Sequence, residues 1–140
     1  MNTAEQSRTR KKRILIVDEE IDVLMELMEI LAVEYDLILC NSGYHAVDNL
    51  NSYDIDIILL CHDLPEMTGL QLFYLIKRMR PRVRTIFLFG AESPEMVIEA
   101  LRAGIDDYIV KPLNPEQLKQ ILKKVERDIE RQEYATVTAG

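Results

Sequence analysis

The sequence has few of the features that mark secreted or membrane proteins. It contains two cysteines, Cys40 and Cys61, in 140 residues. Two cysteines do not make a disulfide framework, and such low usage fits a reducing cytoplasm. No apolar stretch approaches the roughly 18–20 residues that a membrane helix needs, and the start of the chain lacks a signal-peptide core. These absences predict a soluble, cytoplasmic protein without membrane contact.

The sequence also has fewer basic than acidic residues. The chain has 17 lysines and arginines against 24 aspartates and glutamates, which gives a formal net charge of -7. This balance argues against a general nucleic-acid binder and suits an acidic surface or an acidic site. Two basic runs, at residues 8–13 and 77–84, are interpreted as solvated parts of the surface. We therefore expect no nucleic-acid contact within this chain.

The length and the placement of polar residues indicate one domain with two polar ends. A chain of 140 residues is long enough to bury a core without disulfides. Residues 1–12 are polar and carry no period, which predicts a flexible basic leader. The domain is predicted over residues 13–130, and residues 131–140 are predicted to be a polar C-terminal tail or the start of a linker.

Between these ends, short apolar runs alternate with helical patterns five times. The runs are apolar throughout, as in strands that are buried on both faces of a parallel sheet. Five such units with right-handed crossovers predict a three-layer α/β sandwich. The two five-stranded solutions are a flavodoxin-like sheet and a short Rossmann half. The Rossmann half is disfavoured because an acidic run, not a glycine-rich turn, follows the first strand. The predicted strands are residues 14–17, 36–40, 57–60, 85–89 and 108–110.

Charged side chains follow several of these strands at the point where each strand ends. Asp18 and Glu19 follow the first strand, the polar side chain of Cys61 follows the third, and Lys111 follows the fifth. Ligands of open α/β sheets bind beyond the carboxyl ends of the strands. Adjacent carboxylates facing a lysine there make a hard-cation site of the Mg²⁺ type, with a cationic group left for a phosphoryl oxygen.

Two neighbours of these residues are expected to have structural roles. Glu20 is expected to begin the first helix, where an acid interacts favourably with the helix dipole. His62 is expected to be a solvent-exposed loop residue.

Three motifs resemble the response-regulator receiver domain of bacterial two-component signalling, over about residues 13–125. They are ILIVDEE at 14–20, LLCHDLPEMTG at 59–69 and ALRAGIDDYIVKPL at 100–113. The resemblance implies a flavodoxin-like, doubly wound parallel sheet of five strands in the order 2-1-3-4-5. Five helices would complete a three-layer sandwich.

The resemblance also implies roles for individual residues. Asp18 and Glu19 fall on the acidic pair that holds Mg²⁺, with a glutamate where the family more often has aspartate. Asp63 is expected to be either a solvated loop acid or the source of a backbone ligand to this possible, weak metal site. Lys111, which precedes a proline, falls on the lysine that contacts the phosphoryl group. Tyr108 matches the aromatic switch residue.

Two positions depart from the family's pattern. Counting back from Pro65, the phosphoacceptor aspartate is Cys61, and counting back fifteen residues from Gly104, the switch serine or threonine is Phe89. A thiolate is a soft ligand and a poor partner for Mg²⁺, so we expect Mg²⁺ binding to be weak or absent. A phenyl ring cannot donate the hydrogen bond that the switch hydroxyl gives to the phosphoryl oxygen.

The predicted function is a receiver-like signalling module that is not phosphorylated in the usual way and acts through protein–protein contacts. The resemblance places these contacts on the fourth helix, fifth strand and fifth helix, residues 94–130. The partner would be a sensor kinase, an output protein or a second copy in a homodimer. No nucleophile–base pair or cofactor loop is found, so we do not expect an enzyme. Two alternatives stay open: an active phosphorelay receiver with Asp63 as surrogate acceptor, and a metal- or redox-responsive regulator that uses Cys61.

Overall fold

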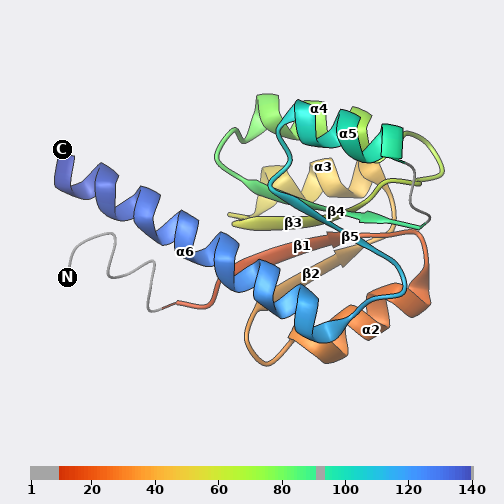
Figure 1. The fold of residues 1–140 in the computed structure, drawn as a ribbon, viewed down its shortest axis with the longest axis horizontal. Helices are drawn as coiled ribbons and strands as arrows, with labels where there is room; N and C mark the ends of the chain where they lie inside the picture. The colour runs from red at the N-terminus through yellow and green to blue at the C-terminus, as the bar shows by residue number, and fades with distance from the viewer. Residues whose placement is uncertain (1–9, 91–93, 140) are drawn as a thin grey trace.

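The computed structural model describes residues 10–90 and 94–139, and five parallel strands in these residues form one sheet (Figure 1). The strand order is β2-β1-β3-β4-β5. This is the order of the flavodoxin-like sheet, so the predicted fold is confirmed and the Rossmann half is excluded. The strands are β1 (Arg13–Val17), β2 (Asp36–Cys40), β3 (Ile57–Cys61), β4 (Arg84–Phe89) and β5 (Asp107–Val110).

Five helices in the described residues cover the two faces of the sheet. Figure 1 shows α2 and α6 on one face and α3, α4 and α5 on the other. Buried side chains form one hydrophobic cluster under each layer. None of the helices in the described ranges has the length and hydropathy needed to cross a membrane. The helices are α2 (Ile21–Leu31), α3 (Gly43–Ser52), α4 (Gly69–Met79), α5 (Pro94–Ala103) and α6 (Pro115–Ala139).

The central positions of the strands are apolar because both faces of the sheet are covered. In β1, Ile14 and Ile16 pack in the cluster under α2 and α6, whereas Leu15 and Val17 pack in the cluster under α3, α4 and α5. Successive side chains of a strand point to opposite faces, so a strand between two helical layers needs apolar residues at every position. All five residues of β3 are buried for the same reason.

The last helix extends further than the sequence predicted. Four buried side chains, from Leu118 to Ile129, pack α6 against the sheet. The helix then continues through the segment predicted as a tail or linker start and projects from the body of the domain (Figure 1). Polar contacts hold the first part of this extension: Arg84 donates a hydrogen bond to Gln132, and the Glu133 carboxylate lies 3.8 Å from the Lys12 ammonium.

The predicted leader is packed against the domain where it is described. Residues 1–9 lie outside the described residues, but residues 10–12 do not. The Lys12 side chain is 3% exposed, and the Arg10 guanidinium makes two hydrogen bonds of 3.1 Å with the Asp56 carboxylate. The folded domain therefore includes residues before the predicted boundary at 13.

Candidate functional site

A crevice of about 490 Å³ opens at the carboxyl ends of the strands. The sequence predicted that Asp18, Glu19, Cys61, Asp63 and Lys111 would meet there, and all five line this crevice. They converge because the ends of adjacent parallel strands lie at one edge of the sheet. Their positions are therefore as expected, whereas their roles remain predictions.

Asp18 is the most buried of these residues, with an exposed fraction of 0%. Its Oδ1 accepts a hydrogen bond of 2.9 Å from the Glu20 backbone N–H. Its Oδ2 forms an ion pair with the Lys111 Nζ at 2.8 Å. The angles of this contact are not those of a hydrogen bond, and Oδ2 accepts no hydrogen bond from the described residues. Both oxygens therefore face positive or donor groups of the chain itself.

Lys111 is the centre of a three-way charge arrangement. Its Nζ lies 2.8 Å from Asp18, 3.2 Å from the Glu20 Oε2 and 3.8 Å from the Cys61 Sγ. Burial lowers the pKa of Lys111, but Asp18, Cys61 and Glu20 together raise it by more, and the net pKa lies above its ordinary value. The lysine is thus a cation with two acidic partners.

Glu20 is the site residue that the sequence analysis missed. It is the residue before α2, as predicted, but its side chain makes no capping hydrogen bond and its carboxylate lies beside Lys111. Glu19, which was expected to form the acidic pair with Asp18, lines the crevice as Glu20 does, and both glutamates are exposed. Of the two, Glu20 pairs with Lys111 in the described residues. The available signal was the run of three acids after the first strand, but spacing alone does not tell which of two adjacent glutamates reaches the lysine.

Cys61 carries a protonated thiol in this environment. Its side chain is 3% exposed, and the thiol donates a hydrogen bond of 3.5 Å to the Asp63 carbonyl. Burial raises the pKa of Cys61 to about 11, and the Asp18 carboxylate raises it as well, against a smaller opposite effect of Lys111. The thiol is therefore neither an anion nor a strong nucleophile at neutral pH.

The loop after Cys61 is held against the domain at several points. A side chain at Gly69 would place its Cβ 2.7 Å from the Cys61 carbonyl oxygen, so the tight return of the loop requires glycine there. Thr68 and Gln71 form a capping box at the start of α4. The Glu66 carboxylate accepts a hydrogen bond from the backbone N–H of Gly43 in α3. Asp63 sits in this loop with an exposed side chain.

An aromatic cluster lies behind the crevice. The Phe89 ring is 1% exposed, and its centroid lies 5.9 Å from Tyr108 in an edge-on arrangement and 5.5 Å from His62. The prediction that His62 is exposed is wrong, because its ring packs on Phe87 and Phe89 and its Nδ1 is buried without a hydrogen-bond partner in the described residues. Tyr108, the predicted switch aromatic, therefore packs against a phenyl ring that joins it to the loop.

The residues of the crevice do not fit a Mg²⁺ ion. The Asp18 oxygens face the Glu20 N–H and the Lys111 ammonium, and Cys61, which lines the same crevice, carries a neutral thiol. Mg²⁺ requires hard oxygen ligands in a near-octahedral arrangement. Among the described residues, no group of three or more histidine, cysteine, aspartate or glutamate side chains is arranged to hold a metal ion.

The chain is similar to two kinds of curated relative. The chemotaxis protein CheY of Thermotoga maritima is 32% identical over 118 residues, which are 83% of this chain and 98% of that protein. The transcriptional regulatory protein ZraR of Escherichia coli is 31% identical over 112 residues, which are 79% of this chain but 25% of that protein. The similarity thus covers nearly all of one relative and one part of a much longer one.

Solved structures show the same fold. A CheY-like response regulator receiver domain protein from Methanospirillum hungatei superposes with a TM-score of 0.78 at 31% identity, over 89% of this chain and 98% of that chain. The signal receiver domain of an HD domain-containing protein from Pseudomonas fluorescens superposes with a TM-score of 0.84 at 26% identity, over 90% of this chain and 94% of that chain.

The family model of the response regulator receiver domain matches residues 14–123. This range contains all residues of the crevice and, apart from the first residue of β1, all five strands of the sheet. Sequence, strand order and the position of the crevice agree with this match. The chain therefore belongs to the response regulator receiver domain family of two-component signalling.

Proposed function

We propose that this receiver domain is not phosphorylated on an aspartate and that it signals through protein–protein contacts in a single conformation. The observation that carries the proposal is the group at the end of β3. Cys61 stands at the phosphoacceptor position, with its Sγ 3.8 Å from the Lys111 Nζ. A receiver takes the phosphoryl group onto a carboxylate oxygen, and this position offers a protonated thiol.

The charges around Cys61 support the proposal. Lys111, the cation expected to contact a phosphoryl oxygen, is paired with Asp18 and Glu20. A phosphoryl group entering the crevice would have to displace these carboxylates without a carboxylate acceptor to receive it. The donor set also suits Mg²⁺ poorly, and without a dication the negative charge of the transferring group stays uncompensated. Mg²⁺ binding is accordingly proposed to be weak or absent.

The switch position, through which a receiver responds to the bound phosphoryl group, is altered together with the acceptor position. Phe89 stands at the proposed switch position and is buried between His62 and Tyr108. It has no hydroxyl to donate to a phosphoryl oxygen, and its ring fills the volume beside Tyr108. Packed aromatic pairs contribute about 0.5–1.5 kcal/mol beyond the area that they bury. The aromatic cluster therefore favours one position of Tyr108.

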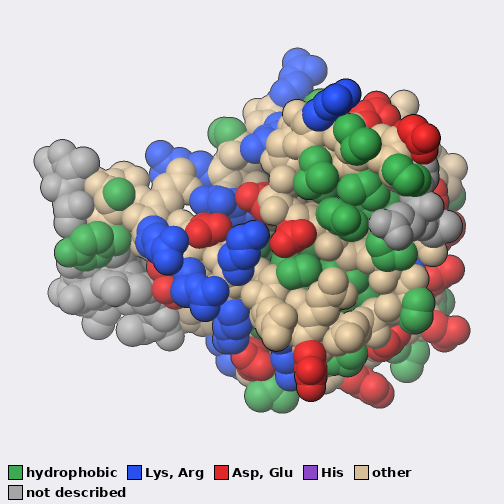
Figure 2. All heavy atoms as spheres, viewed as in Figure 1, with side chains coloured by type: hydrophobic (Ala, Val, Ile, Leu, Met, Phe, Trp, Pro, Cys, Tyr) green, Lys and Arg blue, Asp and Glu red, His purple; other side chains and the backbone are tan. Residues whose placement is uncertain are grey.

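The proposed partner surface is the α5–β5–α6 face, residues 94–130. Ile98 and Leu101 on α5 are each 47% exposed, and Figure 2 shows hydrophobic side chains gathered over α5. Exposed apolar patches of this kind mark protein contacts. A sensor kinase, an output protein or a second copy of this chain would use this face. A cytoplasmic location and the absence of enzymatic activity are part of the same proposal.

The two alternative functions, a surrogate acceptor at Asp63 and a regulator that uses the Cys61 thiol, have less support than this proposal. Asp63, the surrogate acceptor, has an exposed carboxylate in the loop, and its carbonyl accepts the Cys61 hydrogen bond. A redox-responsive thiol needs a low pKa, whereas burial raises the pKa of Cys61 to about 11.

Intact mass spectrometry tests the proposal. The protein is incubated with Mg²⁺ and acetyl phosphate, in parallel with a Cys61→Asp variant as the matched control. We expect no acid-labile phosphoryl adduct on the natural sequence. A stoichiometric adduct lost in an Asp63→Asn variant would instead establish the surrogate acceptor, and one lost in a Cys61→Ser variant would establish phosphorylation of the thiol.

A further inference from the structure

A second cavity lies at the opposite end of the sheet from the crevice. Its volume is about 350 Å³, and it opens between the start of β3, the loop before β4 and the second half of α6. Ile55, Val83 and Ile129 form apolar walls and come from these three segments. Pockets for small ligands begin at about 300 Å³ and are mostly apolar, with a few polar groups that fix orientation. The cavity has this size and composition.

The positive groups that line this cavity lack acidic partners. Arg82 is exposed and has no hydrogen-bond or ion-pair partner among the described residues. Arg80 donates hydrogen bonds to the backbone carbonyls of Met79 and Leu50, at 3.1 and 2.9 Å, and pairs with no carboxylate in the described part of the chain. Both guanidinium charges are therefore uncompensated.

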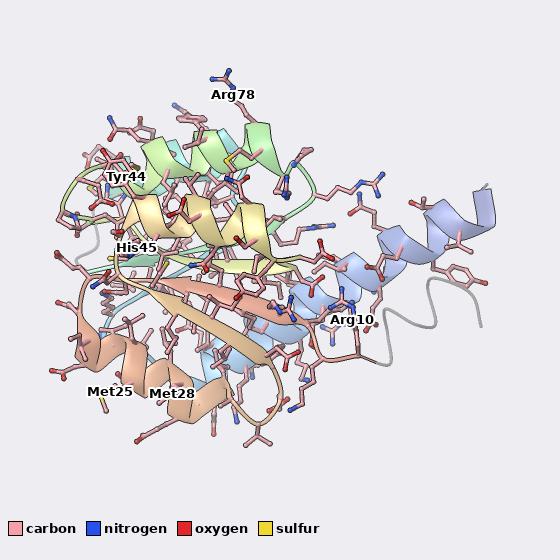
Figure 3. All side chains as sticks on the ribbon, turned by 180° about the vertical axis from the view of Figure 1, so that it is seen from behind. Arg10, Met25, Met28, Tyr44, His45 and Arg78 are labelled. Carbon is pink, nitrogen blue, oxygen red and sulfur yellow. The ribbon has the colours of Figure 1, made fainter. Side chains whose placement is uncertain are left out.

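The negative groups of the same cavity are compensated. Both Asp56 oxygens accept hydrogen bonds from the Arg10 guanidinium at 3.1 Å. Figure 3 shows Arg10 at the amino-terminal end of β1, on the side of α6. The Glu133 carboxylate lies 3.8 Å from the ammonium of Lys12, an ion pair that compensates its charge, although the buried Oε2 accepts no hydrogen bond from the described residues. The uncompensated charge of the lining is therefore positive, and it lies beside apolar walls.

We propose that this cavity binds a small monocarboxylate with a compact apolar body, the carboxylate on Arg82 and the body against Ile55, Val83 and Ile129. A guanidinium matches the geometry of a carboxylate and forms a charge-assisted hydrogen bond with it. The bound molecule contacts the sheet end and α6 together, so it holds the projecting half of α6 in one position. The site does not involve Cys61 and is independent of whether the crevice is phosphorylated.

A titration of the full chain with benzoate tests the site, with benzyl alcohol as the uncharged ligand of similar shape. Backbone amide NMR shifts are followed at Ile55, Val83 and Gln132, which line the cavity. We expect benzoate to shift these amides saturably and benzyl alcohol to bind at least about tenfold more weakly, since a hydrogen bond to a charged group is lost.

Variants of two arginines separate a charge-specific site from general binding. Arg82→Gln is expected to raise the Kd for benzoate about tenfold, and Arg82→Lys, which keeps the charge, by less. Arg78→Gln is the matched control, because Arg78 belongs to the same basic run but points away from the body in Figure 3. The proposal is wrong if benzoate leaves the three amides unshifted, if benzyl alcohol binds as tightly as benzoate, or if Arg78→Gln weakens binding as much as Arg82→Gln.

Discussion

At the carboxyl ends of the strands Lys111 has two acidic partners, whereas at the amino ends Arg82 has none among the described residues. The crevice encloses its cation and presents a neutral thiol, Cys61, beside it. In the cavity at the amino ends, each carboxylate lies beside a cation of the chain, and the Arg82 guanidinium has no partner among the described residues. A lysine that is already paired stabilises the fold, whereas an unpaired arginine is available to a ligand. The comparison is the basis of two proposals: a structural role for the charged residues of the crevice, and ligand binding at the opposite end of the sheet.

The largest expected effect is at the aromatic cluster behind the crevice. Phe89→Ala should lower the free energy of unfolding by about 4 kcal/mol, because the ring is fully buried and leaves a cavity. Arg82→Gln, the matched change at the other end, should stay within about 0.5 kcal/mol, since Arg82 is exposed and unpaired. Urea denaturation measures both. Equal losses in the two variants would contradict the contrast between the two ends.

A smaller loss is expected when the crevice loses its cation. Lys111→Met leaves the Asp18 carboxylate buried without a positive partner, which should cost about 3 kcal/mol of unfolding free energy at neutral pH. An additional Asp18→Asn change removes the unpaired charge and should recover much of the loss. A Lys111→Met variant as stable as the natural protein would show that the ion pair contributes nothing to the fold.

The thiol of Cys61 should make stability fall in alkali. The pKa of the folded-state thiol is raised to about 11, so its contribution is fully present below the ordinary cysteine pKa and is lost as the pH rises through about 11. The contribution is on the order of 2 kcal/mol. Burial also raises the pKa of Cys40 to about 11, so Cys40→Ala should make the decline shallower as well, and comparing Cys61→Ala in the Cys40→Ala background isolates the share of Cys61. Denaturation at a series of pH values should show a shallower decline in Cys61→Ala than in the natural protein. An unchanged decline would mean that the thiol does not titrate as described.

The smallest effect concerns the second partner of Lys111. Glu20→Gln should lower the unfolding free energy by less than about 1 kcal/mol, because its side chain is 59% exposed and surface ion pairs are weak. Its loss should shrink at high salt. A loss as large as that of Lys111→Met, measured by the same denaturation, would make Glu20 and not Asp18 the main partner of the lysine.

The sequence predicted those parts of the molecule that depend on local pattern. Apolar strands imply two covered faces, and the ends of parallel strands bring Asp18, Cys61 and Lys111 to one edge whatever the details of packing. The position of Phe89 followed from its distance to Gly104 in the chain. These inferences needed only the period of the pattern and the order of the strands.

Contacts between distant residues were not predictable in this way. The Glu20 carboxylate and the Lys111 ammonium are 91 positions apart in the chain. Their contact depends on the side-chain rotamer of Glu20, which the sequence does not specify. The packing of His62 on Phe89 depends on a loop that returns tightly at Gly69. In the extension of α6, Gln132 accepts a hydrogen bond from Arg84, which lies 48 residues away in the chain, and the polar composition of this segment alone resembles a tail.

The central claim is that acceptor and readout are both replaced, so that no phosphoryl mimic switches this domain. Its most direct test is amide NMR with Mg²⁺ and beryllofluoride, which mimics the phosphoryl group, on three proteins: the natural sequence, Cys61→Asp, and Cys61→Asp with Phe89→Thr. We predict no shift at Lys111 or Tyr108 in the natural protein, a shift at Lys111 alone in the single variant, and shifts at both residues in the double variant. A saturable shift at Lys111 in the natural protein, or a full shift at Tyr108 in the single variant, would contradict the account.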